Sequence, residues 1–172
     1  MEISKEVLRQ VAEIGSSEVS KAFSKLSGES VEVNASVAEL VSYDFLTESL
    51  SKCSDESVIT YAQTIEGIEG VSMLMIPREA TLSLVDLLNK KEVGTTGVLM
   101  DIDRSAVKET LNILSNSYLN ALSRLSSVDI LIGAPYMMTS KSIGSVLSKF
   151  KEESENGENA TVLFKTVLEI AK

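Results

Sequence analysis

Hydrophobic residues recur every three or four positions along the first part of the chain. Between residues 3 and 27 this spacing gives a helix one apolar side, formed by Val7, Val11, Ile14, Val19, Ala22 and Leu26. Gly28 follows as a helix stop. Apolar and polar residues then alternate from Val31 to Ala35, which predicts a strand. Residues 37–50 are ambiguous and could form a short helix, and a polar loop is expected over 51–57.

The clearest strand pattern lies in the middle of the chain. Two runs rich in β-branched residues, 58–65 and 71–76, flank a short turn that contains glycine, which predicts a hairpin. Pro77 is expected to end the second strand. A helix over residues 79–88 and a loop over residues 90–97 complete this half.

The second half begins with another long amphipathic pattern. It predicts a long helix over residues 103–125 and a strand over 128–134 that is closed by Pro135. A helical stretch over 143–150, an acidic loop over 152–159 and a final strand over 161–170 follow.

The two long helices are similar in sequence when Glu13 is placed on Glu109. Each is followed by a strand and then by less regular sequence, which indicates an internal duplication. We expect a single domain over residues 1–172, with one repeat at about 3–90 and another at about 100–172. The fold class predicted is α/β (α+β): two pseudo-symmetric α–β repeats that share one mainly antiparallel sheet flanked by two long helices.

Composition narrows the possible chemistry. The chain has 172 residues, 44% of them hydrophobic, which suits a globular domain. It has no histidine and a single cysteine, Cys53, so histidine-activated nucleophiles are excluded and a transition-metal site is not expected. A net charge of −9 argues against nucleic acid as a partner and favours a partner protein that has a basic patch. No apolar run reaches membrane-spanning length and no signal-like segment begins the chain, so we expect a cytoplasmic protein without membrane insertion.

A polar stripe runs along one side of the second long helix. Ser105, Glu109 and Asn112 follow one another at helical spacing, and Asn116 continues the stripe. A carboxylate can hold a cation, and an amide can both donate to and accept from one water molecule. The same residues are also ordinary on the solvated face of an amphipathic helix, so the stripe alone leaves both interpretations open.

The stripe belongs to a longer pattern that ends at a proline, and it reads Ser105-x3-Glu109-x2-Asn112-x22-Pro135. This pattern resembles the signature of the CheC/CheX/FliY family of chemotaxis phosphatases. Residues 109–123 resemble the second-repeat helix of CheC, the member that the chain resembles most, and residues 76–88 resemble the segment between the repeats. The resemblance covers about residues 8–150 and includes the duplicated architecture.

The resemblance implies an enzyme, a protein aspartyl-phosphate phosphatase acting on the phosphorylated response regulator CheY. The regulator would supply its own phosphoaspartate and Mg²⁺, so the chain would need no cofactor or metal of its own. Because an aspartyl phosphate is already activated, the catalyst mainly has to place water in line. Asn112 would orient this water and Glu109 would engage a lysine of the regulator. Ser105 and Pro135 would be supporting residues; Ser105 could equally belong to the helix start beside Asp103, and Pro135 could simply end a strand.

The first repeat departs from the family pattern. Glu13 is present, but Arg9 stands where Ser or Asp would be, and Ser16 replaces the Asn. A serine hydroxyl is shorter than a carboxamide and does not offer the same pair of donor and acceptor groups. We therefore expect one functional site and a degenerate first site at Glu13 and Ser16.

Two functions remain open at this point. One is the phosphatase. The other is a non-catalytic chemotaxis adaptor or flagellar-switch-like module that binds CheY or CheD without hydrolysing phosphate. The intact pair of Glu109 and Asn112 favours the enzyme, and pairing with CheD is implied by the resemblance alone.

Overall fold

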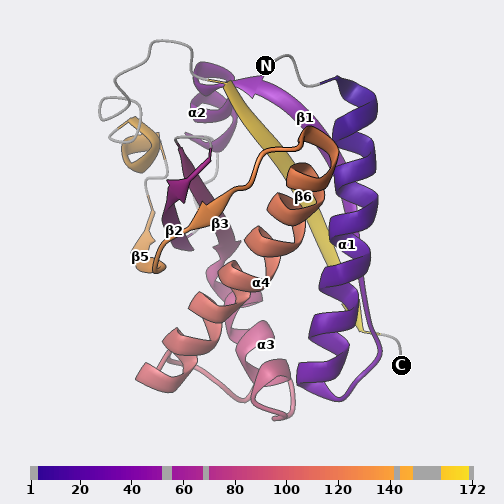
Figure 1. The fold of residues 1–172 in the computed structure, drawn as a ribbon. Helices are drawn as coiled ribbons and strands as arrows, with labels where there is room; N and C mark the ends of the chain where they lie inside the picture. The colour runs from indigo at the N-terminus through magenta and orange to yellow at the C-terminus, as the bar shows by residue number, and fades with distance from the viewer. Residues whose placement is uncertain (1–3, 52–55, 68–69, 142–143, 149–159, 171–172) are drawn as a thin grey trace.

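The computed structural model describes residues 4–51, 56–67, 70–141, 144–148 and 160–170. Helices and strands follow one another as α1 (Lys5–Ser27), β1 (Val31–Ser42), α2 (Tyr43–Ser51), β2 (Ser57–Glu66), β3 (Val71–Pro77), α3 (Arg78–Leu88), α4 (Asp101–Ser126), β4 (Leu131–Ile132), β5 (Tyr136–Ser140) and β6 (Ala160–Ile170). The long helices α1 and α4 lie side by side across one side of the strands, with α3 near the lower ends of both (Figure 1).

The long helices form where the periodicity predicts them, and α1 ends as expected. Gly28 adopts the left-handed conformation, with φ of 81°, and its N–H donates to the carbonyl of Ser24 at 3.0 Å. Glycine takes this conformation without the steric cost that a Cβ would bring. The chain therefore leaves α1 sharply and enters β1 three residues later.

The described strands pair antiparallel in two groups. β1 pairs with β6 along its whole length, and β2 lies between β3 on one side and β4 and β5 on the other. The predicted class of helices on antiparallel sheet is confirmed, although the described pairings form two groups and not one continuous ladder. The strands that follow α1 and α4 are each paired with a strand from the other half of the chain. The division into two repeats stays a prediction.

The structure divides the ambiguous segment over residues 37–50 between the end of a strand and a short helix. β1 continues to Ser42 because the residues from Val37 onward pair with β6, so pairing with a distant segment decides the local structure. Helix α2 begins only at Tyr43, and the backbone N–H of Phe45 donates to the Ser42 hydroxyl at 3.2 Å.

The strand predicted over residues 128–134 is wrong in its extent. In this range only Leu131–Ile132 form a strand. A second strand, β5, begins directly after Pro135, where no strand was expected. Proline has no N–H to donate, so the ladder against β2 is interrupted at this position. Residues 144–148 are helical, as predicted. The ends of that predicted helix, the acidic loop over 152–159 and most of the loop over 51–57 lie outside the described residues.

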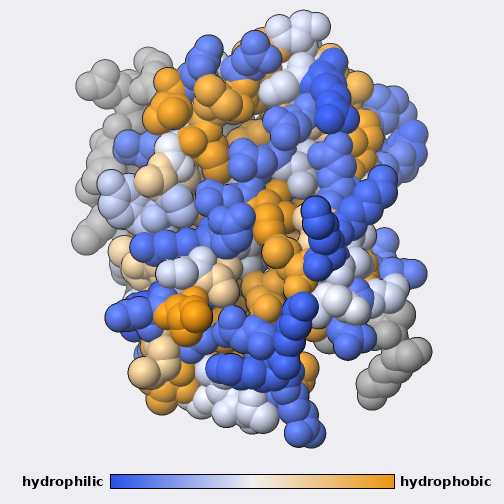
Figure 2. All heavy atoms as spheres, turned by 60° about the horizontal axis from the view of Figure 1, so that its bottom comes forward, coloured by the Kyte–Doolittle hydropathy of each residue, from blue (hydrophilic) through white to orange (hydrophobic). Residues whose placement is uncertain are grey.

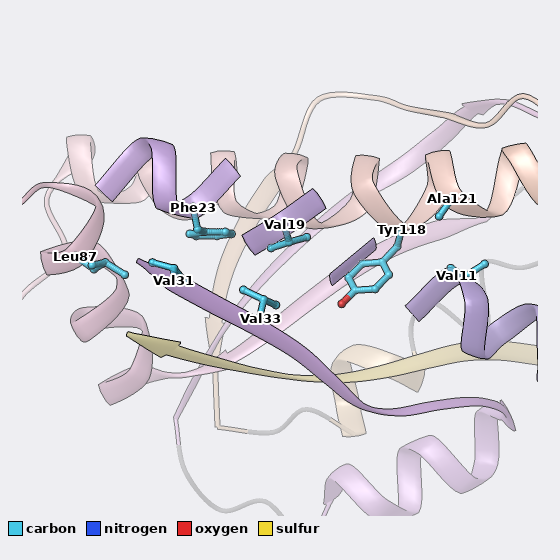
Figure 3. Close-up of a cluster of buried hydrophobic side chains, with 8 residues drawn as sticks. All are labelled: Val11, Val19, Phe23, Val31, Val33, Leu87, Tyr118 and Ala121. Carbon is cyan, nitrogen blue, oxygen red and sulfur yellow. The ribbon is translucent and has the colours of Figure 1, made fainter. Parts of the chain in front are cut away.

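The main core fills the space between the long helices and the pair of β1 and β6. Figure 3 shows the side chains of this cluster, which are Val11, Val19, Phe23, Val31, Val33, Leu87, Tyr118 and Ala121. Side chains on β6 alternate between two faces. Phe164 and Leu168 pack against this core, whereas Leu163 packs on the opposite side with Leu46 of α2 and Leu147. The sheet is therefore covered on both faces here.

Tyr118 sets how closely the long helices approach. A Cβ at Gly15 of α1 would lie 2.4 Å from Cδ1 of the Tyr118 ring, so the ring packs directly on the helix backbone. The ring also stacks on Phe164, with 4.5 Å between ring centroids. The helices run antiparallel, and an ion pair between Arg124 and Glu18 at 3.1 Å joins them further along.

Candidate functional site

The start of α4 is fixed by a buried carboxylate. Asp103 accepts hydrogen bonds from the backbone N–H of Met100 at 2.8 Å and from the side-chain amide of Asn89 at 2.9 Å. The first bond caps the helix, and the second ties α4 to the end of α3. Asp101, in the same first turn, is exposed.

A second buried carboxylate holds the segment between α3 and α4. Asp86 accepts from the backbone N–H groups of Gly94 at 2.8 Å and Thr95 at 3.0 Å, and from the Thr95 hydroxyl at 3.1 Å. Hydrogen bonds, that of the Thr96 side chain first among them, lower the pKa of Asp86 to about 2, although its burial acts in the opposite direction. These bonds position the segment that leads into α4.

Helix α4 presents the predicted carboxylate and amide together. Glu109 is exposed and Asn112 is half-buried, and the Asn112 side-chain N–H donates to a Glu109 carboxylate oxygen at 3.3 Å. In the part of the chain that the structure describes, no lysine or arginine forms an ion pair with Glu109. The carboxylate is thus open to a cation from outside the chain, with an amide beside it.

The two supporting residues occupy different places. Ser105 is exposed one turn before Glu109, and its hydroxyl donates to the Asp101 carbonyl at 3.1 Å, so this hydroxyl bonds its own helix. Pro135 is half-buried in the link between β4 and β5, strands that both contact α4. Pro135 therefore belongs to the strands beside the helix and not to its exposed stripe.

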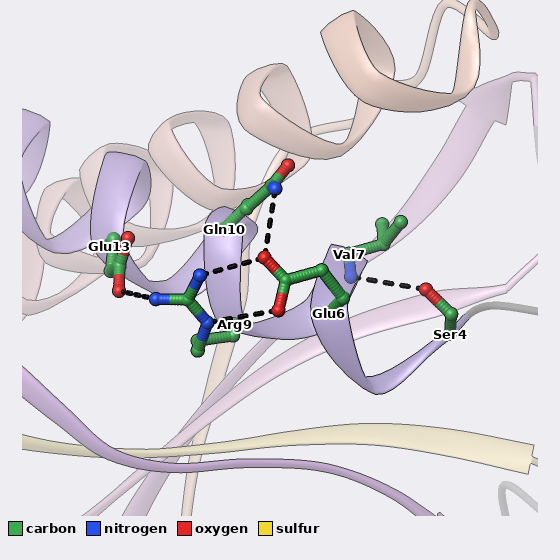
Figure 4. Close-up of polar contacts among 6 residues, drawn as sticks. All are labelled: Ser4, Glu6, Val7, Arg9, Gln10 and Glu13. Carbon is green, nitrogen blue, oxygen red and sulfur yellow. Dashed lines mark hydrogen bonds and ion pairs between the residues drawn. The ribbon is translucent and has the colours of Figure 1, made fainter.

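In the first repeat, the corresponding carboxylate is neutralised within its own helix. Arg9 forms ion pairs with both Glu13 and Glu6, and Gln10 also donates to Glu6, at 3.1 Å (Figure 4). The hydrogen bond from Arg9 is the main reason why the pKa of Glu6 is lowered, and the same contacts raise the pKa of Arg9. Glu13 thus already holds a cation, unlike Glu109.

Ser16, at the position of Asn112, faces the interior. It is 6% exposed, and its hydroxyl lies 3.1 Å from the Tyr118 hydroxyl, which lies 3.4 Å from the Thr166 hydroxyl. The next serines on this side of α1 bond the backbone of β1: the N–H of Val33 donates to Ser20 and the N–H of Val31 donates to Ser24, each at 2.9 Å. These serines stabilise the packing of α1 on the strand.

Glu109 also borders a small pocket that sequence reasoning missed. The pocket has a volume of about 150 Å³ and is lined by Leu26, Leu88, Asn89, Ala106, Glu109, Thr110 and Ile113. Its walls come from the ends of α1 and α3 and from one side of α4. The sequence marks these leucines only as apolar helix positions, so no local pattern could have grouped them.

A larger groove of about 770 Å³ runs between α1 and β1, beside the first-repeat position. Its lining includes residues of both charges, among them Arg9, Glu13, Lys21 and Glu32. Among the described residues, no three His, Cys, Asp or Glu side chains are placed to hold a metal ion together. The helices within these ranges include none with the length and apolar character needed to span a membrane.

Fold and site together define an α+β domain in which two antiparallel long helices cover paired strands, and one helix exposes a carboxylate beside an amide. No family model matches the chain. It is 26% identical over 162 residues to the CheY-P phosphatase CheC of Bacillus subtilis (strain 168), covering 92% of the chain and 77% of that protein. This similarity agrees with the resemblance to the CheC/CheX/FliY family that the sequence motif carries.

Solved structures share the fold at low sequence identity. FliY of Thermotoga maritima superposes with a TM-score of 0.75 at 21% identity, over 99% of this chain and 86% of that one. The FliM middle domain of Vibrio alginolyticus gives a TM-score of 0.65 at 10% identity, over 95% and 86% of the chains. A chain of the FliG–FliM complex from H. pylori gives 0.59 at 18% identity, over 99% and 88%.

Proposed function

We propose that the chain is a phosphatase that hydrolyses the aspartyl phosphate of a CheY-type response regulator. One observation carries the proposal: α4 exposes Glu109 without a cationic partner in the described chain and places the amide of Asn112 against it. The sequence match to a CheY-P phosphatase supports the same substrate. This function would place the protein in the cytoplasm.

The two residues would divide the work. Asn112 would orient a water molecule in line with the bond between phosphorus and the aspartate oxygen, accepting one water hydrogen through its carbonyl oxygen and leaving the attacking lone pair free. The water oxygen then bonds to phosphorus, the bond to the aspartate oxygen breaks, and free phosphate and aspartate result. The regulator would supply the phosphoaspartate and a Mg²⁺ ion that neutralises the phosphoryl charge.

Glu109 would hold the regulator and not act as a base. Phosphoryl transfer passes through a loose transition state in which the attacking water has lost little of its proton, so a general base contributes little, and the carboxylate leaving group needs no general acid. A basic side chain of the regulator would pair with Glu109 and bring the phosphoryl group towards Asn112. The ion pair of Glu13 with Arg9 and the burial of Ser16 support a single working site, on α4.

The experiment is the decay of the phosphorylated regulator with the chain added. We expect Asn112→Ala to lower the accelerated rate by about 100-fold, because the water loses its orientation. The matched control is Asn120→Ala, which removes an exposed amide from the same helix and should retain the full rate. Equal rates for both variants, or no acceleration by the unmutated chain, would overturn the proposal.

The second candidate is a non-catalytic module that binds the regulator, as in a flagellar switch. Its support is the fold shared with FliM, including a FliM that forms a complex with FliG. Binding of the phosphorylated regulator without any change in its decay would select this function. Binding to CheD stays a prediction from the sequence resemblance.

A further inference from the structure

The segment between α3 and α4, here called the interhelix segment (residues 89–100), carries apolar side chains that face solvent. Val98 and Met100 are 71% and 65% exposed, and Val93 and Ile102, the latter in the first turn of α4, are 53% and 69% exposed. The segment lies at the lower end of Figure 1, which Figure 2 turns forward to show hydrophobic side chains among hydrophilic ones. Exposed apolar residues that gather in this way mark interaction sites, whereas single ones are ordinary.

The interhelix segment is held in place although its apolar side chains are exposed. Besides the bonds to Asp86 and Asp103 described above, the Arg78 guanidinium donates to the Gly97 carbonyl oxygen at 2.8 Å. Leu99 packs against a cluster of buried valines from β2, α3 and α4, so its neighbours on both sides are turned outward. A surface whose backbone is already fixed loses little conformational entropy on binding, which favours a specific contact.

Exposed charges of both signs surround these apolar side chains. Before them in the sequence come Lys90, Lys91 and Glu92, and after them, in the first turn of α4, come Asp101 and Arg104. Within the described ranges none of the five forms an ion pair, not even Asp101 with Arg104, one helical turn away. An apolar centre with a polar rim is the usual build of a protein interface, and a rim of both signs is complementary to a second copy of itself.

We propose that the interhelix segment and the first turn of α4 form an interface through which two copies of the chain associate about a two-fold axis. Val98, Met100 and Ile102 pack on their counterparts, because both copies use the same surface. Two antiparallel first turns of α4 place Asp101 of one copy opposite Arg104 of the other. The surplus of cations at this end reduces the repulsion between two chains that each carry a net charge of −9. The association does not depend on the proposed phosphatase activity.

The first test measures self-association of the full chain by sedimentation equilibrium over a range of concentrations. The unmutated chain should form dimers, and Val98→Asp should weaken the dimer by about 10-fold or more, because it buries two carboxylates in the apolar centre. The matched control is Leu125→Asp, at a position 38% exposed near the far end of α4, which should retain the dimer. Urea denaturation of dilute Val98→Asp should show unchanged stability, so that loss of the interface is distinguished from loss of the fold. A monomeric unmutated chain, or equal dimerisation of both variants, would overturn the inference.

The second test uses the two-fold arrangement of the charges. Asp101→Arg and Arg104→Asp each bring like charges together twice in a dimer of one variant, which should weaken that dimer by about 5-fold. When the two variants are mixed in equal amounts, the mixed dimer has opposite charges at both contacts and should be about as stable as the unmutated dimer. An absence of recovery in the mixture would overturn the proposed arrangement.

Two further measurements distinguish other occupants of this surface. If the chain stays monomeric and binds phosphatidylglycerol vesicles in a way that Val98→Asp abolishes, the surface contacts lipid and the inference is wrong. If Val98→Asp instead weakens the binding of the phosphorylated regulator to a monomeric chain, the surface contacts the regulator and the inference is also wrong. A chain that dimerises as described but does not accelerate decay of the phosphorylated regulator would overturn the proposed function and leave this inference standing.

Discussion

The hydroxyl groups of Ser16 and Tyr118 lie 3.1 Å apart at the contact between the two long helices. This pair joins the two halves of the chain, because Ser16 comes from α1 and Tyr118 from α4. The position that matches the amide of the second repeat therefore serves to hold the helices together. Although Ser16 borders the groove between α1 and β1, its side chain is 6% exposed and its hydroxyl is engaged with Tyr118, so it does not project towards a partner as Asn112 does.

We expect Ser16→Ala to lower stability without lowering the phosphatase rate. The substitution removes a buried hydrogen bond, which costs about 1 kcal/mol in the free energy of unfolding. Urea denaturation of Ser16→Ala, Tyr118→Phe and the double variant would measure the coupling between the two hydroxyls. A loss of phosphatase activity at unchanged stability would instead show that the first repeat takes part in catalysis.

Releasing Glu13 from its arginine should not create a second site. Arg9→Ser frees the carboxylate and restores the residue type found at Ser105, but Ser16 stays buried against Tyr118. The decay rate of the phosphorylated regulator should therefore equal that of the unmutated chain, with only a small change in stability because the ion pair is exposed. A faster decay with the Arg9→Ser, Asn112→Ala double variant than with Asn112→Ala alone would contradict this prediction.

Substitution of Gly15 by alanine should destabilise the protein strongly, although it adds only one methyl group. In Gly15→Ala the new Cβ would lie 2.4 Å from the Tyr118 ring, which stacks on Phe164 and cannot simply retreat. Overpacking of this kind costs about 1–3 kcal/mol, measured as a lower free energy of unfolding in urea. Gly97→Ala is the control, because nothing lies within 4 Å of a Cβ there. Equal stabilities would mean that the helices separate without cost.

The carboxylate of Asp86 should make the free energy of unfolding depend on pH in the acidic range. The pKa of Asp86 is about 2 in the fold, below its ordinary value of 3.8. The stability that the ionised carboxylate contributes is therefore fully present above pH 3.8 and is lost as the pH falls towards 2. Asp86→Asn should be less stable than the unmutated chain at neutral pH, and the difference should narrow on acidification. Asp129→Asn, at an exposed position, is the control. A difference that stays constant with pH would contradict this assignment.

The helices and the hairpin could be predicted because local sequence determines them. Gly28 ends α1 and Pro77 ends β3, as expected from their backbone geometry. The continuation of β1 to Ser42 and the strand after Pro135 could not be predicted. Both depend on pairing with strands that lie far away in the sequence, and periodicity does not report such pairing.

The exposed stripe of the candidate site was visible in the sequence, but its surroundings were not. The spacing places Glu109 and Asn112 on one side of α4, where the structure has them in contact. The burial of Ser16 depends on the crossing of two helices, and the pocket depends on Leu26 and Leu88 meeting α4. These are tertiary relationships without a local signature.

The serines of α1 have a consequence for the solubility of the fold. Ser20 and Ser24 bind the backbone N–H groups of Val33 and Val31, at the edge of β1 that β6 does not cover. A bare strand edge invites pairing with a strand of another molecule. Here two hydroxyls of the same chain occupy those backbone groups, so growth of an intermolecular sheet from the first half of β1 requires α1 to detach first. Resistance to amyloid-like assembly at this edge thus depends on the docking of one helix.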